Sequence, residues 1–373
     1  MSGRTAIVTG GQLLSYDLGP SHPLRPERVK VTLALIESLG LMTLLKLLQP
    51  RLAASQELLL FHTEQYLNKV MEYSGRGYGL LDSGDTPAFK GCFEATSWVV
   101  GASLAAIESI MSGGVSHAFN FSGGLHHAHP DRASGFCIFN DAAVCIAFLK
   151  KKYGLKKIAY IDLDAHHGDG VMYGFYDDPS VLDVDLHEDG RYLFPGTGYP
   201  DETGKGEAER LKINVPLPPD TNDNLYIEAF RRTVPPAIKF YEPEFILLQS
   251  GADSHINDPL SHLSITVKTY SEAATTIHDL AHQFCQGRVL VLGGGGYKLS
   301  NAARCWTSVL SSFVGGRLPK VPPEEWRNYY RTITGEEAPT TIAEPEKEIA
   351  DQMKRQEIIG VLEELEKCTC IRN

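Results

Sequence analysis

Midway along the chain stands the segment Lys157-Ile158-Ala159-Tyr160-Ile161-Asp162-Leu163-Asp164-Ala165-His166-His167, in which an apolar run ends in a group of metal-binding side chains. The apolar part is predicted to be a buried strand. Because alternate side chains of an extended chain share a face, we expect Asp162, Asp164 and His166 to project together. A carboxylate and an imidazole two residues apart can bind one divalent ion, with Asp162 left to orient a ligand or to lie beside the ion. The segment therefore predicts a metal site at the end of a strand.

Three further apolar runs also end in reactive side chains. They span Phe119 to His127, Phe245 to Asp253 and Val289 to Tyr297. In a parallel α/β sheet, ligands bind in the crevice beyond the carboxyl ends of the strands, so the four endings are expected to form one shared site. A single Asp-x-His could equally belong to a solvated turn, but the coincidence of four such endings disfavours that alternative.

Segments with apolar residues at helical spacing alternate with these runs. Helices are predicted over 28–48, 56–73, 93–111, 142–152, 223–240 and 269–284. The alternation predicts an α/β fold, with a central, mostly parallel sheet covered by helices on both faces. We assign residues 1–338 to a single domain and 339–373 to a C-terminal segment. An amphipathic helix expected from Glu346 to Lys367 would pack on that domain or contact a partner.

Composition narrows the classes of protein to be considered. The 373 residues are 43% hydrophobic, enough for a sizeable core. No apolar stretch reaches the length of a membrane span and no signal peptide is evident, so we expect a cytoplasmic protein without a membrane partner. The net charge of −11 disfavours nonspecific binding to nucleic acid. Seven cysteines without Cys-x-x-Cys spacing are expected to be reduced thiols.

The candidate metal ligands are Asp164, His166 and Asp253. Three protein ligands would leave a position open for water or a substrate oxygen, as catalytic zinc sites do. Two carboxylates and one imidazole also suit Fe²⁺ or Mn²⁺, so the ligand set leaves the identity of the metal open, with Zn²⁺ preferred.

Two adjacent imidazoles, His126 and His127, follow a glycine pair. Close to a metal they could serve as general base and general acid. Asp162 and Asp169 are available to orient them, because a carboxylate hydrogen-bonded to an imidazole fixes its tautomer.

Tyr297 follows four successive glycines, which allow the chain to bend sharply and to bring the phenol near the metal. Its hydroxyl could donate a hydrogen bond to a developing oxyanion. The alternative is a nucleotide-binding loop, which is disfavoured because the segment lacks the Lys-Ser/Thr ending of such loops.

In combination these motifs resemble the histone deacetylase superfamily, and within it the prokaryotic acetoin utilisation branch with its arginase-like, deacetylase-like fold. The resemblance covers most of the chain, from His22-Pro23-Leu24-Arg25-Pro26-Glu27-Arg28 through Ser134-Gly135-Phe136-Cys137 to Gly293–Tyr297. It implies metal ligation by Asp164, His166 and Asp253. It also implies that His126 and His127 form the catalytic pair and that Tyr297 polarises the substrate carbonyl.

The resemblance further implies a narrow tube for an acylated lysine side chain. Phe136 and Phe194 would form its walls, and Gly135 would allow close approach of the substrate. Leu260 would lie near the mouth, and Asp85 would bind the substrate backbone at the rim.

A potassium site is also implied, built from backbone carbonyls around Asp162, Asp164, His166 and Leu186. Asp185 stands where a serine is frequent in the superfamily. The monovalent site is therefore expected to be more anionic, or differently arranged.

Arginases share the implied fold but hold two manganese ions. Their second site would need an acid at position 168 and an aspartate at position 255, where this chain has Gly168 and His255. The resemblance therefore favours a single-metal amidohydrolase.

The leading hypothesis is metal-dependent hydrolysis of N-acetyl-lysine amides on a protein, with release of acetate. An acyl-CoA synthetase is one conceivable partner. A small-molecule amidohydrolase that acts on acetylpolyamines is the first alternative. A noncatalytic module that binds acyl-lysine is the second, and the complete set of candidate residues disfavours it.

Overall fold

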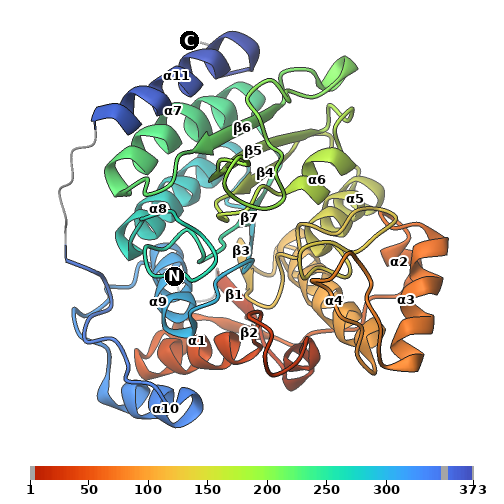
Figure 1. The fold of residues 1–373 in the computed structure, drawn as a ribbon, viewed down its shortest axis with the longest axis vertical. Helices are drawn as coiled ribbons and strands as arrows, with labels where there is room; N and C mark the ends of the chain where they lie inside the picture. Colours follow the sequence, from red (N-terminus) through yellow and green to blue (C-terminus); the bar gives the residue numbers. More distant parts are fainter. Residues whose placement is uncertain (1–4, 346–351, 372–373) are drawn as a thin grey trace.

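The computed structural model describes residues 5–345 and 352–371. Within these ranges one eight-stranded sheet has the order β2-β1-β3-β8-β7-β4-β5-β6, and every strand pair is parallel (Figure 1). The strands are β1 (Thr5–Val8), β2 (Lys46–Leu48), β3 (His117–Asn120), β4 (Ile158–Asp162), β5 (Val181–Glu188), β6 (Lys212–Leu217), β7 (Phe245–Gln249) and β8 (Val289–Leu292). The predicted single α/β domain with a parallel sheet is confirmed.

Helices cover both faces of the sheet (Figure 1). One layer consists of α1 (Glu27–Ser38), α7 (Asp223–Tyr241), α8 (Val267–Phe284), α9 (Leu299–Val314) and α11 (Gln352–Cys368), with α10 (Glu324–Thr334) beside α1. The other layer consists of α2 (Ser55–Leu58), α3 (Glu64–Arg76), α4 (Cys92–Met111), α5 (Asp141–Tyr153) and α6 (Asp169–Gly174).

The sheet separates two hydrophobic cores. Along β4, Ala159 and Ile161 pack into the core beneath α7, α8 and α9, whereas Ile158 and Tyr160 pack into the core beneath α4 and α5. Because both faces of the sheet are buried, the central strands β4, β7 and β8 are apolar up to their last residue. The candidate site lies beyond the carboxyl ends of these strands.

Two of the predicted helices are wrong in part. The segment 28–48 is not one helix, because α1 ends at Ser38 and Gly40 adopts a left-handed conformation with φ of 70°. A 3-10 helix and the short edge strand β2 follow it. The segment 56–73 is also divided. Thr63 caps a new helix by accepting a hydrogen bond from the Tyr66 amide, so α3 begins separately from α2.

The other predicted helices agree with α4, α5, α7 and α8 to within two residues at each end. Of the expected C-terminal helix, residues 346–351 lie outside the described residues, and α11 begins at Gln352. This helix lies against α7 and β6 and buries Ile358, Leu362 and Leu365. The seven cysteines all lie in the described part of the chain, and none forms a disulfide. Among the described helices, none has the length and apolar character to span a bilayer.

Candidate active site

Three candidate metal ligands converge beyond the carboxyl ends of β4 and β7. One donor atom from each of Asp164, His166 and Asp253 lies within 4.8 Å of the others. Nδ1 of His166 is 2.9 Å from Oδ2 of Asp253 and 3.2 Å from Oδ1 of Asp164. Side chains from two neighbouring strand ends, 87 residues apart in sequence at the shortest contact, thus form one cluster.

The backbone fixes both carboxylates. The Gly295 amide donates to Oδ2 of Asp164 over 2.7 Å, and the Ala165 amide donates to Oδ1 of Asp253 over 3.0 Å. Gly295 is required by space, since a Cβ at this position would collide with Oδ2 of Asp253. The glycine segment after β8 therefore closes one side of the cluster and hydrogen-bonds to it.

The charge balance of the cluster fits a bound cation. Asp164 is 1% exposed and Asp253 is fully buried. Burial, together with the neighbouring charge of Asp164, raises the pKa of Asp253. Two buried carboxylates beside one imidazole repel one another, and a divalent ion would neutralise them. The donor set of two oxygens and one nitrogen suits Zn²⁺, Fe²⁺ or Mn²⁺.

The two adjacent histidines each pair with an aspartate. Nδ1 of His126 lies 2.8 Å from Oδ2 of Asp162, and Nδ1 of His127 lies 2.7 Å from Oδ1 of Asp169. The two Nε2 atoms are 3.0 Å apart. His129 also contacts Asp169, with Nε2 3.1 Å from Oδ2. The arrangement consists of two His–Asp pairs whose imidazoles meet.

The surroundings of the two imidazoles are unequal. Burial opposes protonation of His126, but Asp162 and Asp164 outweigh it and raise its pKa to about 10. Burial and the neighbouring His126 lower the pKa of His127 to about 4, against the opposing effect of Asp169. Nε2 of His126 is 3.8 Å from Oδ1 of Asp164, so the pair directly adjoins the ligand cluster.

Tyr297 adjoins the cluster through His166. Its ring centroid is 6.3 Å from that of His166 and 5.8 Å from that of Phe136. Burial and the charges of Asp253 and Asp164 raise the pKa of Tyr297 well above its ordinary value. The phenol therefore keeps its proton and can donate a hydrogen bond.

Three residues that were not singled out as site residues hold the loops in place. Asp258 accepts hydrogen bonds from the amides of Tyr297 and Leu260, over 2.8 and 3.0 Å. Asp141 accepts from the amides of Gly124 and Leu125, over 2.9 and 2.8 Å. Arg28 donates to the carbonyl of Gly294 over 2.5 Å. Only Arg28 lies in a sequence motif already noted, His22–Arg28, and the motif did not indicate this partner.

The expected tube walls adjoin the histidine pair. The Phe194 ring is 5.1 Å from that of His127, and Phe194 itself is 44% exposed. A Cβ on Gly135 would lie 2.6 Å from Cδ2 of His127 and 2.8 Å from Cε1 of Phe194, and φ of Gly135 is +51°. Both space and backbone conformation therefore favour glycine here.

The expected rim residues lie on loops that are tied to this wall. Asp85 is exposed, and its amide donates to Oδ1 of Asp82. Thr86 of the same turn accepts a hydrogen bond from the Phe136 amide over 3.1 Å. Leu260 is partly exposed on the loop that Asp258 fixes.

At the expected monovalent-cation site, Asp185 is buried and already has partners. It accepts from the Gly168 amide over 2.7 Å, and its Oδ1 lies 2.7 Å from Nδ1 of His187. Leu186 is fully buried on β5. His167 lies apart from the ligand cluster, with Nδ1 2.8 Å from Oγ1 of Thr197.

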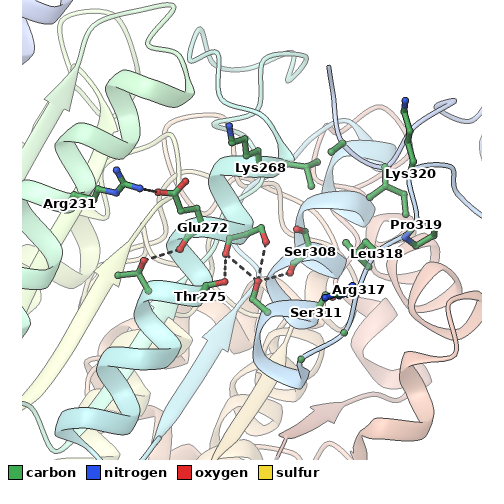
Figure 2. A pocket seen from close by; sticks show the side chains of 18 residues that line it. Arg231, Lys268, Glu272, Thr275, Ser308, Ser311, Arg317, Leu318, Pro319 and Lys320 are labelled. Atoms are coloured by element: carbon green, nitrogen blue, oxygen red, sulfur yellow. Dashed lines mark hydrogen bonds and ion pairs between the residues drawn. The ribbon is translucent and has the colours of Figure 1, made fainter. Parts of the chain in front are cut away.

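A large surface cavity, of about 950 Å³, lies elsewhere, between α8, α9 and the segment after α9 (Figure 2). Its lining includes serines of α8 and α9, and Arg231 points toward Glu272 at one side (Figure 2). None of the described residues that line it belongs to the candidate site. This cavity and the candidate site therefore lie in different parts of the described molecule.

The chain is similar to known proteins over nearly its whole length. Residues 22–313 match the histone deacetylase domain family. The acetoin utilization protein AcuC of Bacillus subtilis (strain 168) is 41% identical over 321 residues, which cover 84% of this chain and 82% of that protein. The AcuC of Staphylococcus xylosus is 33% identical over 368 residues, which cover 96% of this chain and 95% of that protein.

Solved structures show the same architecture. The crystal structure of an HDAC homolog complexed with SAHA has a TM-score of 0.86 and 32% sequence identity, covering 97% of this chain and 99% of that one. The structure of an HDAC homolog from Aquifex aeolicus has a TM-score of 0.85 with the same identity and coverage.

Proposed function

Because the chain belongs to the histone deacetylase family, we propose that it hydrolyses the acetyl amide of acetylated lysine side chains on proteins and releases acetate. The observation that carries this proposal is the meeting of three donor side chains, two His–Asp pairs and a protonated tyrosine at one edge of the sheet. Hydrolysis of an amide needs a nucleophilic water, a proton acceptor and donor, and stabilisation of an oxyanion, and this edge offers a group for each.

We assign Asp164, His166 and Asp253 as the metal ligands and Zn²⁺ as the ion. When bound, the ion supplies a Lewis acid for the amide carbonyl and for the attacking water. Gly295 and Ala165 hold the carboxylates by backbone hydrogen bonds, so the donor atoms are positioned before any ion enters.

The histidine pair handles protons. One imidazole takes a proton from water as the new carbon–oxygen bond forms, and a proton then passes to the amine nitrogen as the carbon–nitrogen bond breaks. The Nε2 atoms of His126 and His127 are 3.0 Å apart, which supports a role of both imidazoles at one reacting group. Asp162 and Asp169 each fix one imidazole through Nδ1 and leave its Nε2 facing the site.

Tyr297 stabilises the oxyanion. Its phenol keeps its proton because burial and the nearby carboxylates disfavour the phenolate. Asp258 accepts a hydrogen bond from the Tyr297 amide, and Arg28 donates one to the carbonyl of Gly294, three residues earlier. A donor that is already held in position needs little reorganisation when the oxyanion forms, so its hydrogen bond lowers the activation barrier more effectively.

Substrate recognition follows from the walls of the site. Phe136 and Phe194 would enclose the methylene chain of acetyl-lysine, while the exposed Asp85 would accept hydrogen bonds from the peptide backbone. We propose an acetylated protein as partner, with an acyl-CoA synthetase as first candidate. The support is the name of the relatives, which associates them with acetoin utilisation.

We also assign a K⁺ ion to the carbonyls around Asp162, Asp164, His166 and Leu186. Both carboxylate oxygens of Asp185 already have partners in the Gly168 amide and His187, so the side chain is not expected to coordinate the ion directly. Unchanged activity after exchange of K⁺ for a bulky organic cation would remove this assignment.

The proposed function is tested by acetate release from an acetyl-lysine peptide. The zinc-loaded parent is compared with Tyr297→Phe, and with Tyr329→Phe as a control, since Tyr329 lies on α10 away from the site. We expect kcat to fall about 100- to 1,000-fold in Tyr297→Phe and to stay unchanged in the control. Activity on acetylspermidine but not on the peptide would favour the acetylpolyamine alternative, and inactivity toward both would contradict amide hydrolysis.

A further inference from the structure

Three histidines lie near the amino end of β3, whereas the candidate active site lies beyond the carboxyl ends of the strands. His117 is the first residue of β3, in register with Thr5 of β1 and Val289 of β8. His278 and His282 lie in the C-terminal turns of α8, and both rings contact that of His117. We call this group of His117, His278 and His282 the amino-end histidine cluster.

The geometry of the cluster is that of a metal-binding group. One donor nitrogen from each imidazole lies within 4.8 Å of the others. His278 and His282 are four residues apart on one helix, so they lie on the same face. Nε2 of His282 is 3.3 Å from Nε2 of His117. Two nitrogens bound tetrahedrally at the usual Zn–N distance would be separated by about 3.3 Å.

The surrounding residues position the three rings. Phe313 of α9 packs against His117 and His278, with ring centroids 5.1 and 5.2 Å away. Gly287 leaves room on another side, since a Cβ there would lie 2.7 Å from Cε1 of His282. His117 is buried, His278 is half-buried and His282 is exposed. The cluster thus has a fixed floor and a side open to solvent, through which an ion and its water ligands can enter.

We propose that the amino-end histidine cluster is a second metal site, which binds one divalent ion of the late first-row series, Zn²⁺, Ni²⁺, Cu²⁺ or Co²⁺. Three imidazole nitrogens suit these ions, whereas Mg²⁺ and Ca²⁺ prefer oxygen donors. Asp279 lies 3.5 Å from Nδ1 of His278 and adds negative charge beside the cluster. A bound ion connects α8 to β3, so the site stabilises the fold at the end remote from the proposed catalysis.

The test counts metal ions in chelator-treated protein after equilibrium dialysis against Zn²⁺ or Ni²⁺. The parent is compared with Asp253→Asn, with the double variant His278→Gln/His282→Gln, and with Gln283→Ala, an exposed neighbour on α8 that serves as control. We expect about two ions per chain in the parent and in the control. Each of the other two variants should bind one ion fewer, and their combination none.

The identity of the site is checked by spectroscopy. Cu²⁺ bound to Asp253→Asn should give an electron paramagnetic resonance spectrum with nitrogen coupling, and the added histidine substitutions should abolish it. Zn²⁺ should also raise the melting temperature of Asp253→Asn by a few degrees, but not after the histidines are replaced. Far-UV circular dichroism verifies that every variant is folded. If Asp253→Asn misfolds, the proposal is tested by comparing the metal content of the parent with that of the double histidine variant.

The proposal is overturned if the double histidine variant binds as many ions as the parent. It is equally overturned if the parent binds a single ion that Asp253→Asn removes. Neither result depends on deacetylation, and loss of peptide hydrolysis would leave this site unaffected.

Discussion

Asp169 is hydrogen-bonded to the imidazoles of His127 and His129. It therefore fixes the orientation of His127 in the proposed catalytic pair. We expect Asp169→Asn to lower kcat by about 100- to 10,000-fold, because an amide neither compensates an imidazolium nor enforces the same tautomer. The measurement is the steady-state kinetics of acetate release, with Asp177→Asn, an exposed acid after α6, as the matched control.

Metal content is determined for the same samples. Asp169 contacts none of the three candidate ligands through the hydrogen bonds of the described residues, so Asp169→Asn should bind as much zinc as the parent. A loss of kcat that merely followed a loss of zinc would refute a role in orienting His127.

The grouping of the candidate ligands could be predicted from the sequence because alternate side chains of an extended segment point to the same side. Asp164 and His166 are two residues apart just beyond the recognisable strand β4, and Asp253 follows the end of β7 by four residues. The supporting residues could not be predicted in this way. Arg28 binds a carbonyl 266 residues away, and Asp141 and Asp258 accept from backbone amides that carry no side-chain pattern.

Glu344, in the segment that follows α10, ties this segment to α9 and to the loop after β7. Its Oε1 lies 3.0 Å from Nε2 of His255, and Arg304 also donates to it. Burial opposes ionisation, but His255 and Arg304 outweigh it and lower the pKa of Glu344 to about 2. Since the folded-state pKa lies below the unfolded one, the charge stabilises the fold above about pH 4.5, and this contribution is lost as the pH falls toward 2.

We therefore expect Glu344→Gln to lower the free energy of unfolding at pH 7 by about 1–3 kcal/mol, because the buried Arg304 loses its charged partner. The variant should also show a weaker dependence of stability on pH between 2 and 4.5. Urea denaturation at several pH values measures both effects. Parallel stability curves for parent and variant across that range would contradict the assignment.

Helices could be predicted from the sequence where apolar residues at helical spacing continue over a long segment without interruption. The long buried helices α4, α7 and α8 are of this kind. The first hundred residues were harder to predict. Apolar spacing continues through Gly40 and across 59–63, but a left-handed glycine and the Thr63 cap end the helices there. Apolar periodicity indicates which face of a helix is buried, but it does not indicate where the helix begins or ends.

In the described residues the two large cores share one sheet, so we expect the molecule to unfold as one unit. Leu362→Ala on α11 and Leu104→Ala on α4 each remove a fully buried side chain, from opposite cores. Each substitution should lower the free energy of unfolding by about 2–5 kcal/mol and shift the same single transition. Urea denaturation followed by circular dichroism and by tryptophan fluorescence tests this. Transitions that separate in either variant would show that the layers unfold independently.

The strand order has a consequence for synthesis on the ribosome. Among the described residues β8 is the last strand in sequence, yet it lies between β3 and β7 in the middle of the sheet. In the described sheet no other strand joins β2-β1-β3 to β7-β4-β5-β6, so a nascent chain carries two separate half-sheets until residues 289–292 have left the exit tunnel. During that interval the facing edges of β3 and β7 are open to other chains. Chaperone demand should therefore be greatest before residues 289–292 leave the exit tunnel.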